Sequence, residues 1–113
     1  MCNCHPCMQE LGRYIRALHC PTRWTIIDFI GDGSRSTKQI YEFLTGRGEK
    51  MTFSGLYYHL SELNHADIIE VSEYRESGRG APEKVWKLKT KRIVIELLDK
   101  QENPSSGRIY MEY

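Results

Sequence analysis

The chain has 113 residues and a formal net charge of +1. That length suits one domain with a modest core, and the near-neutral charge excludes a strongly basic field over the whole molecule. No apolar run approaches the roughly 20 residues that a membrane span needs, and the N-terminus lacks the basic-then-apolar pattern of a signal peptide. We therefore expect a soluble, cytoplasmic protein.

Residues 1–8, MCNCHPCM, form a cysteine-rich tail before any periodic segment begins. Thiolate and imidazole are suitable ligands for Zn(II) or another thiophilic metal. The candidate ligands are Cys2, Cys4, His5, Cys7 and Cys20. A disulfide between Cys4 and Cys7 would instead make the tail a redox switch, and incidental reduced thiols are the third alternative.

Two helices are predicted before residue 31. Over residues 9–18 the apolar side chains recur at the spacing of one helical face, i, i+3, i+4 and i+7. Cys20 and Pro21 then interrupt the pattern, and Thr22 is the predicted N-cap of a second helix with a wide apolar surface. Gly31 begins the turn that ends this second helix.

Two further helices follow. Ser36 and Gln39 fit a capping box, which predicts a third helix over residues 37–45. Thr52 is the predicted N-cap of a fourth helix, over residues 52–65. Its apolar stripe is Phe53, Leu56, Leu60 and Leu63, and its opposite face carries Ser54, Tyr58, Ser61, Glu62 and His65. Hydroxyl, phenol and imidazole groups suit contacts with base edges, while a solvated amphipathic helix without a role is the plain alternative.

A β-hairpin is predicted after the fourth helix. Residues 68–74 and 83–88 are rich in Ile, Val, Tyr and Trp. The connection over residues 76–82 has two glycines and a proline and places Arg79 at the tip, where a solvated loop residue is the alternative. Residues 75–92 hold seven Arg or Lys and two Glu, a net charge of +5. Basic side chains are thus concentrated in one region, as phosphate binding requires.

A last helix is predicted over residues 90–101. Its apolar residues Ile93, Val94, Ile95, Leu97 and Leu98 cover more than one helical face, so we expect one face to meet a second subunit. The expected organisation is therefore a tail over residues 1–8, one domain over residues 9–101, and a flexible C-terminal tail over residues 102–113.

This order of elements resembles the ArsR/SmtB-type winged helix-turn-helix repressors of bacteria and archaea. Four stretches carry the resemblance. Ala17-Leu18-His19-Cys20-Pro21-Thr22-Arg23 is similar to the family's Ala-Leu-x-x-Pro-Thr-Arg, and Tyr58-His59-Leu60-x-x-Leu63 to its His-Leu-x-x-Leu. Ala66-Asp67-Ile68-Ile69 falls where the family has Ala-Gly-Leu-Val, with Asp67 suited to a left-handed turn, and residues 84–88 resemble the second wing strand. The wing and the Leu-Tyr-Tyr of residues 56–58 lean toward PadR-like regulators.

The resemblance implies a mainly α fold with a β-hairpin wing, dimerising through the first and last helices. Residues 52–65 become the recognition helix in the major groove. The implied DNA contacts are Ser54, Tyr57, Tyr58 and Ser61 on that helix and Arg75, Arg79, Lys84 and Lys87 on the wing. The implied dimer interface comprises Leu11, Ile15, Ile93, Val94, Leu97 and Leu98. Helical periodicity and the resemblance disagree about Phe53. Its helical position points it inward, whereas the family often has a polar DNA-contacting residue at the equivalent position.

His59 is interpreted as a packed, hydrogen-bonded residue at the edge of the core, not as a catalytic or metal-binding group. In the family, metals are commonly sensed by thiolates on the third helix or by carboxylates and histidines on the last helix. Neither set occurs here, which leaves the N-terminal cysteines as the candidate sensor.

The predicted function is that of a homodimeric, sequence-specific DNA-binding transcription regulator, acting as a repressor, with metal or redox sensing through the cysteines as an open option. The alternative is a winged-helix module for protein interactions, which the low net charge favours. An enzyme is not expected, because there is no phosphate-cradling glycine loop, no H-E-x-x-H and no supported nucleophile, and no cofactor is required.

Overall fold

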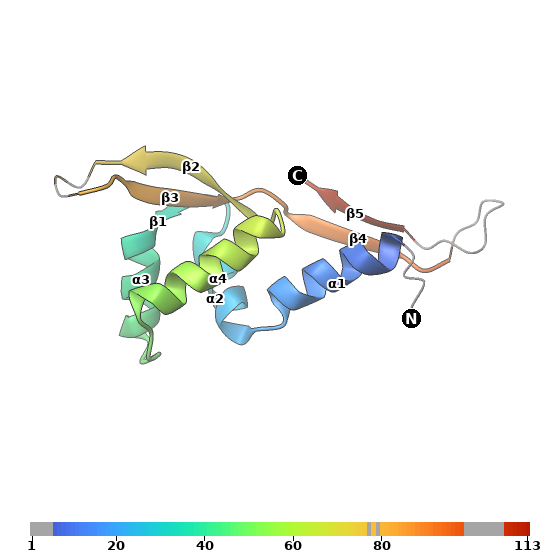
Figure 1. The fold of residues 1–113 in the computed structure, drawn as a ribbon, viewed down its shortest axis with the longest axis horizontal. Helices are drawn as coiled ribbons and strands as arrows, with labels where there is room; N and C mark the ends of the chain where they lie inside the picture. Colours follow the sequence, from blue (N-terminus) through green and yellow to red (C-terminus); the bar gives the residue numbers. More distant parts are fainter. Residues whose placement is uncertain (1–5, 77, 79, 99–107) are drawn as a thin grey trace.

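A computed structural model of the chain describes residues 6–76, 78, 80–98 and 108–113, with side chains for all of these except residues 6–8 and 108–110. Figure 1 shows the arrangement of the elements. In chain order they are α1 (Pro6–Leu18), α2 (Pro21–Ile30), β1 (Ser34–Ser36), α3 (Thr37–Gly46), α4 (Phe53–His65), β2 (Ile69–Arg75), β3 (Glu83–Leu88), β4 (Arg92–Glu96) and β5 (Arg108–Glu112).

The core lies between α2, α3, α4 and the β2–β3 sheet. The apolar stripes predicted for these helices converge there on side chains that are at most 2% exposed: Ile26, Ile30, Ile40, Leu44, Leu56, Leu60 and Leu63. Trp86 of β3 and Ala17 of α1 belong to the same cluster. Full burial of one Leu or Ile is worth about 1.5–3 kcal/mol relative to exposure, so this cluster holds α4 in a fixed place on the domain.

The predicted caps of α3 and α4 are confirmed. Ser36 accepts a hydrogen bond from the backbone N–H of Gln39 at 3.1 Å, and the Gln39 side chain accepts one from the backbone N–H of Ser36 at 2.8 Å. Thr52 accepts one from the N–H of Gly55 at 3.0 Å. Each cap satisfies donors that the first turn of a helix leaves unpaired.

The predicted N-cap of α2 is wrong. Cys20 occupies the N-cap position with extended backbone, and Pro21 begins the helix. Proline suits the first helical position because its fixed φ is already helical and its missing N–H would have no partner there. Thr22 lies inside the helix, and its hydroxyl donates to the Glu49 carboxylate at 3.1 Å.

The wing is a three-stranded antiparallel sheet in the order β1-β3-β2. The two predicted strands are confirmed, with a register shift between Val71 and Glu73. Strand β1 was not predicted, because a three-residue polar segment has no strand pattern of its own and exists by pairing with β3. Asp67, in the turn before β2, has φ 60° as the sequence predicts for a left-handed turn.

The root of the wing is joined to α3 by three hydrogen bonds. The Thr37 hydroxyl donates to the Lys84 carbonyl at 3.1 Å and accepts from the Trp86 indole N–H at 3.0 Å. The backbone N–H of Lys38 donates to the Glu83 carboxylate at 2.6 Å. These bonds fix the direction in which the wing leaves the helices.

The predicted helix over residues 90–101 is wrong, because residues 92–96 form strand β4, which pairs with β5 from Arg92↔Glu112 to Glu96↔Arg108. Residues 108–112, predicted as part of a flexible tail, supply that partner strand. Short β-branched runs are ambiguous between helix and strand until a partner is known. At the other end, α1 begins at Pro6, inside the segment predicted as a tail.

Helix α1 and the β4–β5 hairpin run side by side and away from the other helices (Figure 1). We call these three elements the arm. The arm makes the molecule elongated, 58 × 26 × 24 Å, with a radius of gyration of 16.9 Å, against about 13 Å for a compact domain of 100 residues. None of the helices within the described parts of the chain combines the length and apolar character required to cross a bilayer.

Candidate nucleic-acid interface

One face of α4 is available to a ligand. Ser54, Tyr57 and Tyr58 are exposed and Ser61 is half-buried, while Leu56 and its stripe neighbours are buried on the opposite side. Tyr57 and Tyr58 are 53% and 60% exposed to solvent. The structure therefore brings the four contact residues predicted on this helix together on its outward face.

Phe53 does not point inward as its helical position suggests. It remains 47% exposed, and its ring stacks on Tyr41 of α3 with centroids 4.0 Å apart and planes 12° apart. As the first residue of α4, Phe53 precedes the turn that covers the core, so its side chain lies over α3 at the rim of the domain. Neither Tyr41 nor an outward Phe53 was identified from the sequence, since both depend on how α3 and α4 cross.

A buried arginine holds α4 in place. Arg23 of α2 is 6% exposed, and its Nε–H donates to Nδ1 of His59 at 3.0 Å. One terminal nitrogen donates to the carbonyls of Arg16 at 3.0 Å and Ala17 at 3.2 Å, at the end of α1. The guanidinium carbon also lies 5.5 Å from the centroid of the Tyr58 ring. One side chain thus joins α1, α2 and the outward face of α4.

His59 acts as the acceptor in this contact. Burial lowers the pKa of His59 and the positive charge of Arg23 lowers it further, while Glu49 has an opposing effect. Because Nδ1 accepts the hydrogen bond, the neutral imidazole carries its proton on Nε2. The prediction that His59 is a hydrogen-bonded residue at the core edge is confirmed.

Two of the basic residues predicted on the wing have acidic neighbours. Lys87 lies 3.6 Å from the Glu70 carboxylate and Arg75 lies 3.4 Å from that of Glu73. Strands β2 and β3 together carry three basic and three acidic side chains, so the two strands taken as a whole have no net charge. Arg79 lies outside the described residues.

Lys84 and Tyr74 extend the sheet face that packs on the helices. They are cross-strand partners, and Lys84 shares its face with Trp86, two residues along β3, whose indole is in the core. Tyr74 is 63% exposed, and the Lys84 ammonium lies 5.8 Å from the Trp86 ring centroid. Sequence reasoning identified Lys84 but omitted Tyr74, although strand alternation places the two together.

The candidate metal ligands are only partly within the described structure. Cys2, Cys4 and His5 lie outside it, the Cys7 side chain is not described, and Cys20 is half-buried at the start of α2. Cys7 lies in the first turn of α1 and Cys20 beyond its last turn; this helix has 13 residues, about 20 Å at 1.5 Å per residue. Donors around one zinc lie within a few ångströms of each other, so one chain cannot offer both thiols to the same ion.

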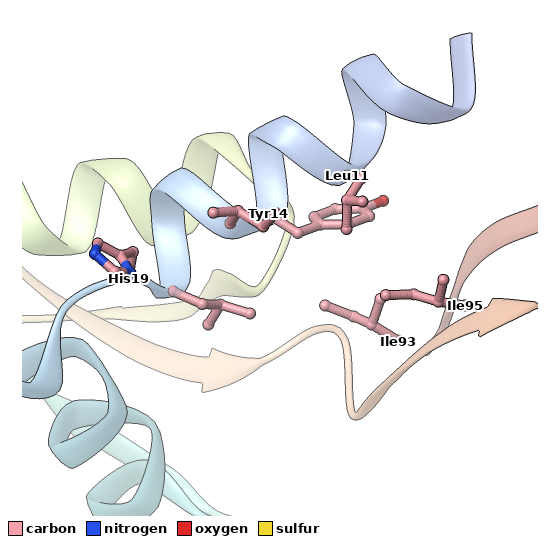
Figure 2. A pocket seen from close by; sticks show the side chains of 7 residues that line it. Leu11, Tyr14, His19, Ile93 and Ile95 are labelled. Atoms are coloured by element: carbon pink, nitrogen blue, oxygen red, sulfur yellow. The ribbon is translucent and has the colours of Figure 1, made fainter. Parts of the chain in front are cut away.

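The residues predicted for a dimer interface divide between two faces of the arm. Ile93 and Ile95 face α1 and, with it, line an open hollow of about 310 Å³ (Figure 2). The hollow is lined by Leu11, Tyr14, Ile15, Leu18, His19, Ile93 and Ile95. Val94 lies on the opposite face of β4, because alternate residues of a strand point in opposite directions. Leu97 and Leu98 are 85% and 86% exposed beyond the strand.

No family model and no curated protein matches the sequence. Among solved structures, the chain is similar to Rv0081 of M. tuberculosis, with a TM-score of 0.57, 16% identity and 76% of each chain covered. It is also similar to the ferric uptake regulator (Fur) of Vibrio cholerae, a protein with DNA-binding domains, with a TM-score of 0.51, 15% identity and coverage of 88% of this chain and 76% of that one. These likenesses, together with the order of helices and wing, identify the fold as a winged helix-turn-helix.

Proposed function

We propose that this protein is a homodimeric transcription regulator that binds a specific DNA sequence through α4 and the wing and represses by occupying its site. The observation that carries the proposal is the outward face of α4, where Ser54, Tyr57 and Tyr58 are exposed. This helix is held on the domain by the hydrogen bond from Arg23 to His59. Repression is inferred from the resemblance to ArsR/SmtB-type repressors. The similar fold of a regulator with DNA-binding domains supports the general function.

The chemistry of the surface fits a duplex. Serine and tyrosine hydroxyls donate to phosphates or base acceptors, and a phenol ring can pack on a thymine methyl. Surface ion pairs are worth about 0–1 kcal/mol, so Arg75 and Lys87 can leave their carboxylate neighbours for phosphate oxygens at little cost. Lys84 adds a cation on the same face as Tyr74.

The arm supports the proposed dimer. A two-stranded hairpin is marginally stable alone, and here its apolar face and α1 leave a hollow open to solvent. Ile15 and Ile95 on its rim are 52% and 46% exposed. A second copy placed on this face by a two-fold axis would cover the hollow of both subunits. Two recognition helices would then meet half-sites about 34–36 Å apart.

DNA binding is tested by selecting bound sequences from a random duplex pool and measuring affinity for the selected site by fluorescence anisotropy. We expect Tyr58→Ala to weaken binding by about fivefold to 150-fold, in line with about 1–3 kcal/mol for a base contact. Tyr113→Ala, which truncates a 70% exposed tyrosine at the end of the arm, is the matched control and retains affinity. Recovery of no preferred sequence by the wild type would refute the proposal.

The dimer is tested by sedimentation equilibrium. Ile95→Glu places a charge on the rim of the hollow and is expected to shift the protein toward monomer. Val94→Glu places the same charge on the opposite face of β4 and is expected to leave the dimer intact. Equal sedimentation of the two variants would show that the hollow is not the interface.

A winged-helix module for protein interactions is the second candidate. The balanced charge of β2 and β3 favours it, because non-specific attraction to DNA phosphates is correspondingly weak. The sequence-selection experiment separates the two candidates, since an interaction module would recover no preferred duplex.

We further propose that the cysteine-rich tail makes DNA binding responsive to a thiophilic metal or to oxidation. Cys4 and Cys7 are close in sequence, and His5 lies between them. The distance along α1 restricts an ion shared by Cys7 and Cys20 to one bound across two subunits.

A further inference from the structure

Phe53 is exposed at the point where a recognition helix enters a groove. It is the first residue of α4, and the N-terminal residues of such helices contact base edges. Tyr57, one turn further, lies on the same side and is similarly exposed. The surface at this end of α4 is therefore aromatic and largely apolar.

The Phe53 ring is held in position before any ligand binds. One of its faces is covered by Tyr41, with centroids 4.0 Å apart and nearly parallel planes. A fixed ring loses little rotamer freedom on binding, which lowers the entropic cost of a contact. Leaving about half of a phenylalanine in water is unfavourable unless a partner covers it, so the exposed part of this ring is suited to an apolar contact.

The first two turns of α4, FSGLYYHL, contain no Arg, Lys, Asn or Gln. Those are the side chains that form bidentate hydrogen bonds to guanine or adenine in the major groove. The apolar group that the major groove offers is the C5-methyl of thymine, which phenylalanine contacts favourably. Apolar contact is thus the form of base recognition that this end of the helix is equipped to make.

We propose that Phe53 is a specificity-determining residue that recognises thymine through its methyl group, and that Tyr41 is the residue that positions it. This inference rests on the DNA binding proposed above. It assigns to Phe53 a preference for thymine at the bases nearest the N-terminus of α4.

The experiment uses the full chain and its selected duplex, prepared with thymine or with uracil, which differ by the methyl group alone. We expect uracil at the half-site bases nearest the N-terminus of α4 to weaken wild-type binding about fourfold for each contacted methyl, from about 0.8 kcal/mol per buried carbon. Uracil placed outside the half-sites is the control for altered duplex flexibility. Phe53→Ser is expected to bind both duplexes equally, and Phe53→Leu to retain part of the discrimination.

Tyr41→Ala keeps Phe53 and removes its support, so the ratio of the two affinities is expected to fall toward one without reaching it. Phe43→Leu, which alters the separate Phe29–Phe43 stack, is expected to leave the ratio unchanged, and thermal unfolding checks that each variant folds.

Equal wild-type affinity for both duplexes, with the selected site still preferred over a scrambled one, would overturn the methyl recognition and leave the DNA binding standing. Discrimination that persists in Phe53→Ser would overturn the assignment to Phe53. A failure to prefer any duplex would instead refute the proposed function.

Discussion

Arg23 of α2 donates its Nε–H to Nδ1 of His59 in α4 at 3.0 Å. The two residues come from two separate sequence motifs, the Pro-Thr-Arg that opens α2 and the His-Leu-x-x-Leu of α4. Their contact links the two motifs in this protein, because one supplies a buried donor and the other its acceptor. It also joins the outward face of α4 to the end of α1, where the arm begins.

Loss of the Arg23 guanidinium is expected to destabilise the protein by about 3 kcal/mol, because Arg23→Met removes charge-assisted bonds and leaves the carbonyl of Ala17 without its donor. Urea unfolding measures the change. Arg47→Met is the matched control, since Arg47 is exposed at the end of α3 and is expected to change stability by less than about 0.5 kcal/mol. Equal effects of the two substitutions would contradict this role for Arg23.

The stability of the protein is expected to decrease at acid pH through His59. Its pKa in the folded protein is lowered from the ordinary histidine value of about 6.5, first by burial and then by the positive charge of Arg23. Between the folded and unfolded pKa values the unfolded state binds more protons, so the free energy of unfolding falls as the pH drops below about 6.5. Above about pH 6.5 the His59 imidazole is neutral in both the folded and the unfolded state, so it contributes no pH dependence to stability there.

Urea unfolding from about pH 8 to about pH 5 tests this dependence. His59→Gln offers a neutral acceptor to Arg23 and is expected to flatten the part of the profile below about pH 6.5. His65→Gln alters an exposed histidine at the end of α4 and is expected to keep the wild-type profile. Identical profiles for wild type and His59→Gln would show that another group titrates.

The Thr37 hydroxyl is expected to contribute about 2 kcal/mol to stability, because Thr37→Val retains the shape and leaves the Trp86 indole N–H and the Lys84 carbonyl without this partner. Thermal unfolding measures the loss, and hydrogen exchange in β3 is expected to accelerate. Thr45→Val removes a hydroxyl that bonds only within α3 and serves as the control. A Thr37→Val protein as stable as the control would mean that the wing is held by packing alone.

The cysteine proposal predicts a change of about tenfold in DNA affinity, a coupling of about 1.4 kcal/mol, on adding zinc or an oxidant. Anisotropy on the selected duplex measures it, with a chelator as the reference state. Replacing Cys2, Cys4 and Cys7 with serine is expected to abolish the response, while Cys20→Ser distinguishes a site in the tail from one shared across subunits. An affinity for the selected duplex that is the same with zinc, with oxidant and with chelator would refute the cysteine proposal.

Local sequence was sufficient to identify α2, α3, α4 and the two long wing strands. Their periodicity, the capping box at Ser36 and the cap at Thr52 act within a few residues, so no distant partner is needed to specify them. The same holds for the outward position of Tyr57 and Tyr58, which follows from the buried stripe on the other side of the helix. A left-handed turn at Asp67 was likewise determined by the residue and its neighbours.

Only the tertiary structure decided the features that depend on distant pairing. Residues 92–96 become a strand because residues 108–112 pair with them, and no local pattern in an Ile-Val-Ile run reveals that partner. The Phe53 ring lies over α3 because the crossing of α3 and α4 places Tyr41 beneath it, and Lys87 lies beside the Glu70 carboxylate because antiparallel register places the two residues opposite each other. Secondary structure here follows from short-range periodicity, whereas the composition of the binding surface follows from which segments meet.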